Sequence, residues 1–237
     1  MDVEIKKLPW DSLFFGYSIG KVFLDDFDEH LLAKVKVDSE RFKLSYVFSN
    51  EKIDYKGFKH VDTKIIFKKE NFQIPFEVSK SLSITSFDKD VHDSVELKNL
   101  ALQSGKHSRF YVDEGFKNDE YDKLYSEWLS KSLKKKLAFQ TLVALEEKKI
   151  IGFVTIAKVN DETAEIGLLA VDAMTRGKGV GSQLINKATQ LILELGYNSF
   201  LVATQEINIP AVKLYKKAGF KELSLQYIYH IWNDDTL

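Results

Sequence analysis

The sequence predicts an α/β (α+β) fold in which a sheet is flanked by helices. Short apolar runs typical of strands alternate with segments of helical apolar spacing. A glycine-rich loop joins an expected strand at 165–171 directly to an amphipathic helix that begins near residue 182. With 237 residues and 44% hydrophobic content, the chain can bury a substantial core. We expect a smaller N-terminal α/β lobe at 1–78 and a main domain at 79–237.

The N-terminal lobe is expected to contain four strands and one helix. Pro9 ends the first strand, because proline supplies no donor to the ladder of a sheet. Trp10, Phe14 and Phe15 follow, and these aromatic residues either pack in a core or form a wall against a ligand. Polar residues at 69–80 predict a linker to the main domain. The expected strands are 3–8, 17–24, 44–49 and 63–68, and the expected helix is 28–42.

The main domain is expected to begin with a strand and two helices, followed by a hairpin. The charged turn at 146–149 connects the two arms of this hairpin. After the glycine-rich loop and its helix, the chain continues as a strand, a second helix and a last strand. The expected strands are 81–87, 139–145, 150–158, 165–171, 200–204 and 225–232, and the first two helices are 90–104 and 118–134.

A short pattern occurs in both halves of the chain. Gly57-Phe58-Lys59 and Gly219-Phe220-Lys221 each follow a strand and a turn or helix, and each precedes another strand. This spacing suggests a degenerate internal repeat, whose N-terminal copy lacks the glycine-rich loop. A glycine that merely ends a helix would give a similar pattern by chance.

The composition excludes several classes of function. Lys and Arg total 34 against 35 Asp and Glu, so there is no overall attraction to nucleic acid or to an anionic membrane. Cysteine is absent, which excludes a thiol nucleophile and a cysteine-bound zinc. The five histidines are scattered without ligand spacing, so no metal site is expected. Without a signal-like or membrane-spanning apolar segment, a cytoplasmic location is expected.

The glycine-rich loop at 176–182 fits one of three known types of phosphate-binding loop. The spacing of a Walker-type loop is absent, and the dinucleotide fingerprint fails because Ser182 stands where its last glycine should be. The pattern Arg-x-x-Gly-x-Gly is filled by Arg176, Gly179 and Gly181, between a strand and an amphipathic helix. Backbone N–H groups at such a helix start attract anions.

The order of motifs after this loop is specific. Asn208-x-x-Ala211-x-x-Leu214-Tyr215 follows, and then Gly219-Phe220. Together with the loop, these residues resemble the acyl-CoA-binding signature of the GNAT superfamily of N-acetyltransferases. Two further segments, at 8–16 and 108–128, resemble a bacterial subgroup of sugar-nucleotide acetyltransferases within it.

The resemblance implies a GNAT fold, with a mixed and centrally splayed sheet, that binds acetyl-CoA. The pyrophosphate would lie on the N–H groups at the helix start. In the direct transfer that the family carries out, the Val171 N–H would stabilise the oxyanion, Tyr215 would be the general acid, and Asn208 would hold the cofactor or a water. The implied cofactor-binding residues are Leu169, Ala170, Val171, Arg176, Gly177, Lys178, Gly179, Val180, Gly181, Ser182, Asn208, Ala211 and Tyr215.

The acceptor side of the site is expected in the N-terminal lobe and in the segment 104–110. Arg109 is suited to a diphosphate, and an aromatic ring to a base, although the same residues can equally dock the two lobes. The general base is left open between Glu165, Asp172, His107 and a chain of waters. The candidate substrate-binding residues are Asp11, Phe14, Phe15, Lys106, Ser108 and Arg109.

The resemblance therefore implies an acetyl-CoA-dependent N-acetyltransferase that acts on the amine of a dTDP- or UDP-linked amino sugar in polysaccharide biosynthesis. A peptide, protein or small amine as acceptor is one alternative. A non-catalytic acyl-CoA-binding domain, which would tolerate loss of Tyr215, is another. The sequence leaves open whether the chain forms a homodimer.

Overall fold

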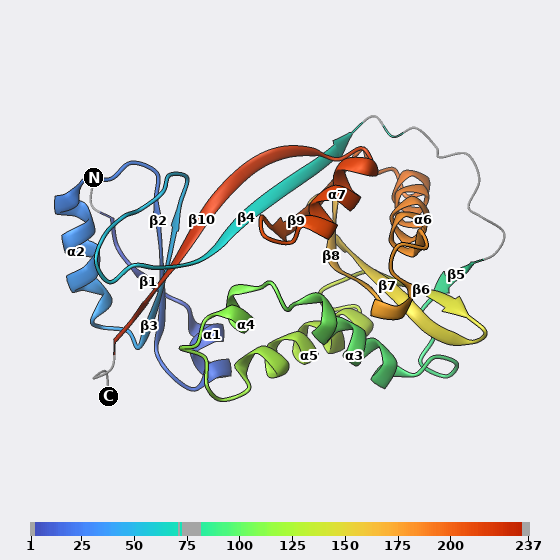
Figure 1. Cartoon of the computed structure of the whole chain (residues 1–237), viewed down its shortest axis with the longest axis horizontal. Helices are drawn as coiled ribbons and strands as arrows, with labels where there is room; N and C mark the ends of the chain where they lie inside the picture. Colours follow the sequence, from blue (N-terminus) through green and yellow to red (C-terminus); the bar gives the residue numbers. More distant parts are fainter. Residues whose placement is uncertain (1–2, 71, 73–81, 234–237) are drawn as a thin grey trace.

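The computed structural model describes residues 3–70, 72 and 82–233, and it confirms the α/β fold (Figure 1). Within these residues, ten strands form one mixed sheet in the order β1-β2-β3-β10-β4-β9-β8-β7-β6-β5. The strands are β1 (Lys6–Lys7), β2 (Ile19–Leu24), β3 (Leu44–Ser49), β4 (Lys59–Glu70), β5 (Ser83–Ser86), β6 (Gln140–Glu146), β7 (Lys149–Lys158), β8 (Thr163–Val171), β9 (Ser199–Gln205) and β10 (Lys221–Trp232).

Helices cover both faces of the sheet. α6 and α7 pack on one face of the main domain through a core that includes Leu184, Ile185 and Tyr215. α3 and α5 pack on the other face, through Leu97 and Leu129. The helices are α1 (Pro9–Phe15), α2 (Glu29–Ser39), α3 (Ser94–Ser104), α4 (Arg109–Val112), α5 (Glu120–Leu133), α6 (Val180–Glu194) and α7 (Ile209–Lys217), and η1 (Ala173–Thr175) is a 3₁₀ turn.

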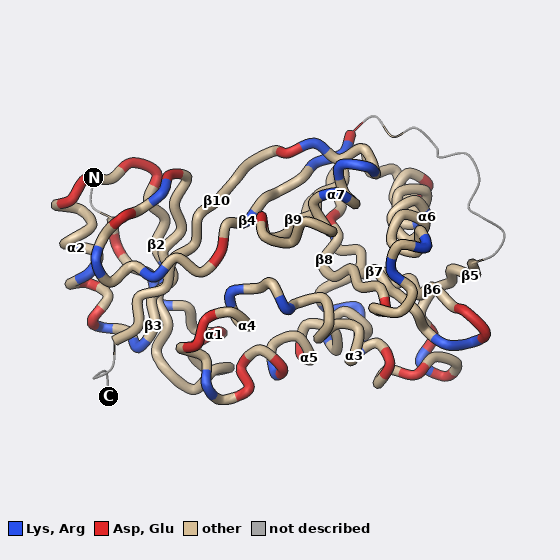
Figure 2. Tube along the Cα trace, in the orientation of Figure 1, with Lys and Arg blue, Asp and Glu red and all other residues tan. Residues whose placement is uncertain are grey.

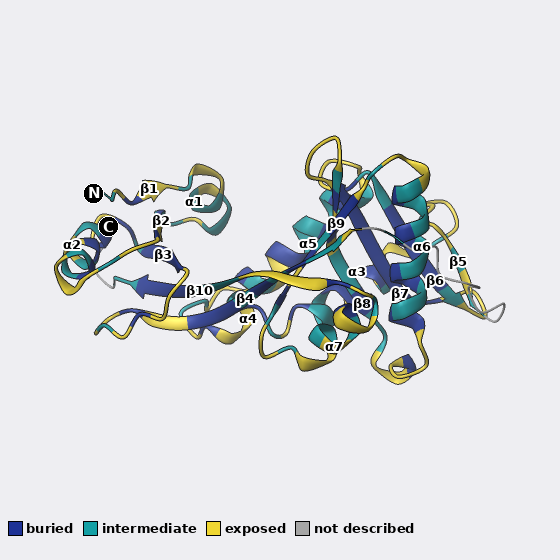
Figure 3. Ribbon diagram, turned by 90° about the horizontal axis from the view of Figure 1, so that it is seen from above, coloured by how far each residue is buried: buried dark blue, intermediate teal, exposed yellow. Residues whose placement is uncertain are grey.

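The two halves of the sheet have matching arrangements and exchange a strand. β2 and β3 are parallel and joined by α2, while β8 and β9 are parallel and joined by α6. β4, from the N-terminal half, pairs with β9, and β10, from the C-terminal half, pairs with β3. The two exchanged strands also pair with each other and form the long ribbon that connects the lobes (Figure 3). The degenerate repeat stays a prediction from the sequence.

The N-terminal part of the sheet is also covered on both faces. α2 packs on one face through Leu32 and Val35. On the other face, Phe14 and Phe15 of α1 meet Phe110 of α4 and Leu124 of α5 in a second cluster. The face with α4 and α5 thus continues from the main domain to the N-terminal lobe.

Some local predictions differ from the structure. Pro9 begins helix α1 instead of only ending a strand, because proline at the first helical position needs no N–H partner. α6 begins at Val180, two residues before the expected start, and the short helix α4 was not expected. Residues 69 and 70 of the expected linker belong to β4; the rest of it, apart from residue 72, lies outside the described residues, as does the expected boundary at 78/79.

No helix in the described part of the chain is long and apolar enough to cross a membrane.

Candidate active site

The parallel strands β8 and β9 diverge halfway along their length. Their pairing ends at Ile166 and Val202. Beyond that point β8 contains a bulge, where Gly167 and Leu168 face the single residue Thr155 of β7. The Thr155 Oγ1 accepts a hydrogen bond of 2.8 Å from the Leu168 N–H, which holds the bulge in place. A gap therefore opens between β8 and β9, as the predicted splayed sheet requires.

The free edge of β8 presents backbone donors to this gap. The Asp172 N–H donates to the Ile151 carbonyl at 2.8 Å. Hydrogen-bonded and non-hydrogen-bonded pairs alternate along an antiparallel ladder, so Val171 and Leu169, each opposite a residue of β7, occupy the non-hydrogen-bonded positions. Their N–H groups consequently face away from β7, toward the gap.

The loop after β8 brings the start of α6 to the mouth of the gap. Gly177 has φ +80° and Gly179, the residue before α6, has φ +83°, a backbone conformation that side chains other than glycine rarely adopt. A Cβ at Gly177 would meet no atom within 4 Å, and one at Gly179 would meet only the Gln183 side chain, at 4.0 Å. At Gly181, by contrast, a Cβ would lie 3.0 Å from Leu214. The first two glycines leave open space above the backbone, and the third allows α6 to pack closely against α7.

These features fit the acetyl-CoA that the sequence implies. The first N–H groups of a helix have no partner within the helix and carry partial positive charge, and here they border the open space at Gly177 and Gly179. The Arg176 Nε donates to the Val171 carbonyl at 3.1 Å, so this arginine links the loop to the end of β8. An anionic pyrophosphate can approach the loop, and an extended chain can lie along the free edge of β8.

A cavity of about 270 Å³ lies at the gap, and residues from both faces of the sheet line it. Its walls come from β4, from the diverging ends of β8 and β9, from α7 on one face, and from α3, α4 and α5 on the other. The lining residues are Asp62, Lys64, Ser104, Ser108, Arg109, Phe110, Tyr125, Trp128, Ile166, Gly167, Leu168, Leu169, Val202, Ala203, Thr204, Gln205, Asn208, Ala211 and Tyr215.

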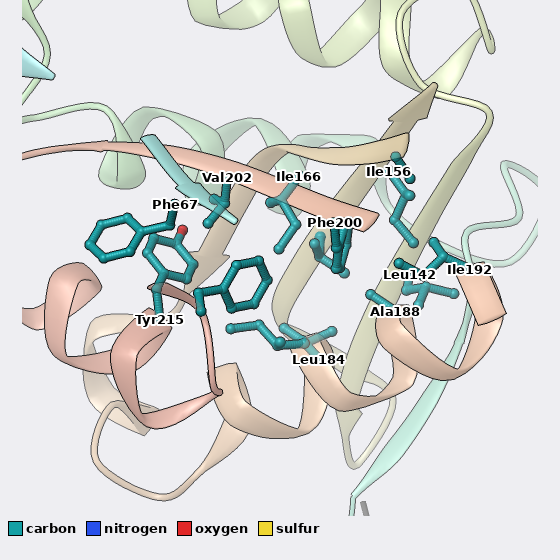
Figure 4. Close-up of a cluster of buried hydrophobic side chains, with 14 of the residues drawn as sticks. Phe67, Leu142, Ile156, Ile166, Leu184, Ala188, Ile192, Phe200, Val202 and Tyr215 are labelled. Carbon is teal, nitrogen blue, oxygen red and sulfur yellow. The ribbon is translucent and has the colours of Figure 1, made fainter. Parts of the chain in front are cut away.

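Tyr215 and Asn208 line this cavity from α7. Tyr215 is 5% exposed, and its ring lies beside that of Phe67, with centroids 6.0 Å apart (Figure 4). The ring centroid of Phe220 is 5.9 Å from that of Tyr215. Burial raises the pKa of its hydroxyl well above the ordinary value, so the group keeps its proton. The Asn208 Oδ1 caps α7 by accepting from the Ala211 N–H at 3.3 Å. This cap fixes the start of the helix that carries Tyr215, and Asn208 itself is one of the cavity-lining residues.

Asp62 is a buried carboxyl group in the cavity wall, and it comes from the N-terminal half. The side chain lies on β4, where the register with β10 shifts between Asp62 and His60 and so inserts a bulge at Val61. It is 7% exposed, and its Oδ1 is buried without a hydrogen-bond partner among the described residues. Burial raises its pKa to about 6, although Arg109 and Lys64 oppose the shift.

Two cations lie beside Asp62. Burial and the neighbouring Arg109 lower the pKa of Lys64, while Asp62 raises it. The Arg109 guanidinium carbon lies 4.5, 5.0 and 5.6 Å from the ring centroids of Phe110, Tyr46 and Phe48. Its Nε is buried without a hydrogen-bond partner in the described structure. Lys and Arg are interspersed with Asp and Glu along the chain, so this charge is a local feature of the cavity (Figure 2).

The other predicted acceptor residues lie at different distances from the cavity. Ser108 lines it beside Arg109, whereas Lys106 is exposed and is not part of the wall. Phe15 stacks on Phe110 with centroids 6.0 Å apart, and Phe14 contacts Phe15, so both rings pack where the lobes meet. Asp11 is not among the residues that line the cavity; burial raises the pKa of its carboxyl, and the charges of Arg109 and Lys21 oppose this rise.

The three candidate bases do not line the cavity, within the described residues. The Asp172 Oδ1 accepts from the Met174 N–H at 2.9 Å and caps the 3₁₀ turn. Glu165 is exposed and His107 is half-buried. Asp62 and Lys64 were missed. They occupy alternate positions of β4 and so lie on one face of it, but β4 contains other charged residues as well, and Asp62 precedes the strand expected at 63–68.

The gap between diverging parallel strands, followed by the glycine-rich start of a helix, defines the class of acyl-CoA-dependent acetyltransferases with the GNAT fold. Residues 106–220 match the sequence profile of the Acetyltransferase (GNAT) family. The chain thus contains a GNAT acetyltransferase domain, and the acetyl donor of this family is acetyl-CoA.

Individual relatives cover different shares of the chain. It is 25% identical over 230 residues to dTDP-fucosamine acetyltransferase of Escherichia coli, which covers 94% of this chain and 96% of that protein. It is 26% identical over 140 residues to the spore coat polysaccharide biosynthesis protein SpsD of Bacillus subtilis, covering 59% of this chain and 48% of SpsD, so the match spans about half of that relative. A conserved Staphylococcus epidermidis protein of unknown function has a similar fold, with TM-score 0.67, 15% identity, and coverage of 97% and 92%.

Proposed function

We propose that the protein transfers an acetyl group from acetyl-CoA to the amine of a nucleotide-linked amino sugar. The observation that carries the proposal is the cavity at the gap in the sheet, where Asp62 of the N-terminal half and Tyr215 of the C-terminal half line the same space. A carboxylate that can accept a proton and a hydroxyl that can donate one are the two groups that acetylation of an amine needs.

The charges in the cavity favour an acceptor that carries negative charge. Lys64 and Arg109 line it together with Asp62, and neither cation forms a salt bridge among the described residues. A polycationic amine would be repelled by this pair, whereas the phosphates of a sugar nucleotide would be attracted. The match to dTDP-fucosamine acetyltransferase, which spans nearly the whole of both chains, supports the same class of acceptor.

The residues of the cavity have distinct roles in this reaction. Bound acetyl-CoA supplies the acetyl group as an activated thioester. The Asp62 Oδ1 takes the proton from the acceptor nitrogen, and its raised pKa of about 6 lets it release that proton to solvent near neutral pH. The N–H groups of Val171 and Leu169 stabilise negative charge at the edge of β8. Tyr215 holds its proton at Oη and is positioned to return one to the leaving group.

A thiol-release assay with acetyl-CoA and a panel of acceptors tests this function. We expect turnover with amino sugars linked to dTDP or UDP, and little or none with polyamines or peptides. Turnover on peptides together with none on any nucleotide-linked amino sugar would refute the proposed acceptor. Binding of acetyl-CoA without release of thiol on any amine would favour a non-catalytic acyl-CoA-binding domain.

A further inference from the structure

An exposed aromatic side chain lies next to the cavity on the N-terminal lobe. Phe23 of β2 is 52% exposed, and its ring stacks on Phe48 of β3 with centroids 4.9 Å apart and an angle of 27° between the rings. Phe48 also faces the cavity residue Arg109, whose guanidinium carbon is 5.6 Å from its ring centroid. One face of β2 and β3 therefore leads from the cavity to an aromatic surface that is open to solvent.

Cations flank this aromatic surface. Lys21 lies on the same face of β2 as Phe23, with its Nζ 4.9 Å from the ring centroid. Lys6 of β1 is the direct cross-strand neighbour of Lys21. The acid Asp11 interacts electrostatically with both Lys21 and Arg109. Lys6, Lys21 and Arg109 thus place positive charge on this face, where the acids Asp11, Asp113 and Glu120 also act on Tyr46.

A buried hydroxyl between these groups lacks a partner. Tyr46 is directly opposite Lys21 on β3, and the Arg109 guanidinium carbon lies 5.0 Å from its ring centroid. The side chain is 1% exposed, and its hydroxyl makes no hydrogen bond within the described residues. Buried polar groups in proteins nearly always have a partner, so an additional hydrogen-bonding group, from a ligand or a water, is expected here.

We propose that this face is a subsite for the nucleoside diphosphate part of the acceptor, with the base stacked on Phe23 and the diphosphate held between Lys21 and Arg109. The inference rests on the proposed function and identifies where the nucleotide binds. The cavity of about 270 Å³ has room for the amino sugar at Asp62, and the nucleotide extends from it across β3 and β2. The Phe23 ring is half exposed, so a nucleobase can stack on it where the Lys21 Nζ lies over the ring, while Lys21 turns to the diphosphate.

Binding of dTDP and UDP to the whole protein, measured by isothermal titration calorimetry, tests the subsite without any acetyl transfer. Phe23→Ala and Lys21→Gln should each raise the Kd of both nucleotides about tenfold, as expected for the loss of one stacked base or one phosphate contact. Two matched variants should leave the Kd unchanged: Val37→Ala, which truncates a 63% exposed side chain of α2, and Lys7→Gln, which removes an exposed cation adjacent to Lys6 on β1.

Kinetics with two acceptors separates this inference from the proposed function. With the nucleotide-linked amino sugar as acceptor, Phe23→Ala should raise KM about tenfold and leave kcat unchanged. With the 1-phosphate of the same amino sugar, which lacks the nucleoside, Phe23→Ala should leave KM unchanged. Unchanged nucleotide Kd values in both variants, or no nucleotide binding to the wild-type protein, would overturn the subsite while turnover still supports the function. Nucleotide binding through Phe23 without turnover on any amino sugar nucleotide would uphold the subsite and refute the function.

Discussion

Burial gives the Asp62 carboxyl a pKa of about 6, so its charge changes within the pH range of an ordinary enzyme assay. If Asp62 is the general base, activity requires its ionised form, and kcat/KM should fall as the pH decreases through about 6. Asp62→Asn should lower kcat/KM by roughly 100-fold or more and remove this acidic limb. The measurement is a pH profile of thiol release for both proteins.

The matched control for Asp62→Asn is Asp161→Asn, because Asp161 is an exposed acid in a surface ion pair with Lys158. This variant should keep both the wild-type rate and the wild-type pH profile. An acidic limb that persists near pH 6 in Asp62→Asn would assign the proton transfer to another group.

A single substitution at Tyr215 can show whether its hydroxyl acts in the chemical step or in binding of the cofactor. Tyr215→Phe keeps the ring beside Phe67 and Phe220 and removes the hydroxyl that faces the cavity. We expect kcat to fall by on the order of 100-fold, while the Kd for CoA, measured by calorimetry, stays within about twofold.

The control for Tyr215→Phe is Tyr229→Phe. Tyr229 is also buried, but its hydroxyl accepts from the Ile53 N–H at 2.7 Å, away from the cavity. A wild-type kcat in Tyr215→Phe would exclude this tyrosine as the acid.

At the residue scale, the sequence predicted Tyr215, Asn208 and Arg109 because they belong to motifs. It missed Asp62, because β4 reaches the cavity only through its pairing with β9, whose residues lie far along the chain.

At the scale of elements, alanine substitutions on either side of α6 distinguish two roles of its flanking glycines. One role is to avoid backbone strain, and the other is to let a ligand approach the backbone. Gly179 precedes α6 with φ +83° and Gly196 follows it with φ +86°. Alanine at either position adopts the left-handed conformation at a cost of about 1–2 kcal/mol in the free energy of unfolding. Gly179→Ala should also raise KM for acetyl-CoA about tenfold, because its methyl group occupies the space that a phosphate would use.

Gly196→Ala should lose similar stability and keep the wild-type KM for acetyl-CoA. Urea unfolding and initial-rate kinetics measure the two quantities. Equal KM values in the two variants would contradict a phosphate site at this loop.

Most elements were predicted from apolar periodicity within a few residues, whereas α1 and α4 were not, since short helices contain too few residues to show a period.

At the scale of the whole molecule, a buried ionic network connects the two halves. Asp113 accepts from His230 and Trp232 of β10 at 2.5 and 2.7 Å, and from Lys59 of β4 at 2.8 Å. Burial alone would raise the pKa of Asp113, but these hydrogen bonds outweigh it and hold the pKa well below the ordinary value. Burial lowers the pKa of His230 to about 4, despite Asp113, so this histidine is neutral at pH 7.

Asp113→Ala should therefore lower the free energy of unfolding by about 3–5 kcal/mol at pH 7, because it leaves buried donors without an acceptor. Urea unfolding followed by tryptophan fluorescence measures the loss. Asp161→Ala removes an acid paired with Lys158 at 2.5 Å on the surface, and it should change the same quantity by less than about 1 kcal/mol. Equal losses in the two variants would mean that the network contributes no more than a surface pair.

The exchange of β4 and β10 was not predictable from local patterns. Both strands are recognisable in the sequence, but their neighbours depend on contacts between residues far apart in the chain. The repeat expected from the sequence predicts two similar units, but it does not predict that these units exchange their last strands.

The exchanged strands also constrain how the protein can fold during its synthesis. β3 emerges from the ribosome early, but one of its two neighbours is β10, which ends at Trp232. Chains with several lobes usually fold the N-terminal one first as they are translated. Here the sheet of the N-terminal lobe cannot be completed until β10 has been synthesised. Until then, β3 and β4 have unpaired edges, to which a strand of another nascent chain can add.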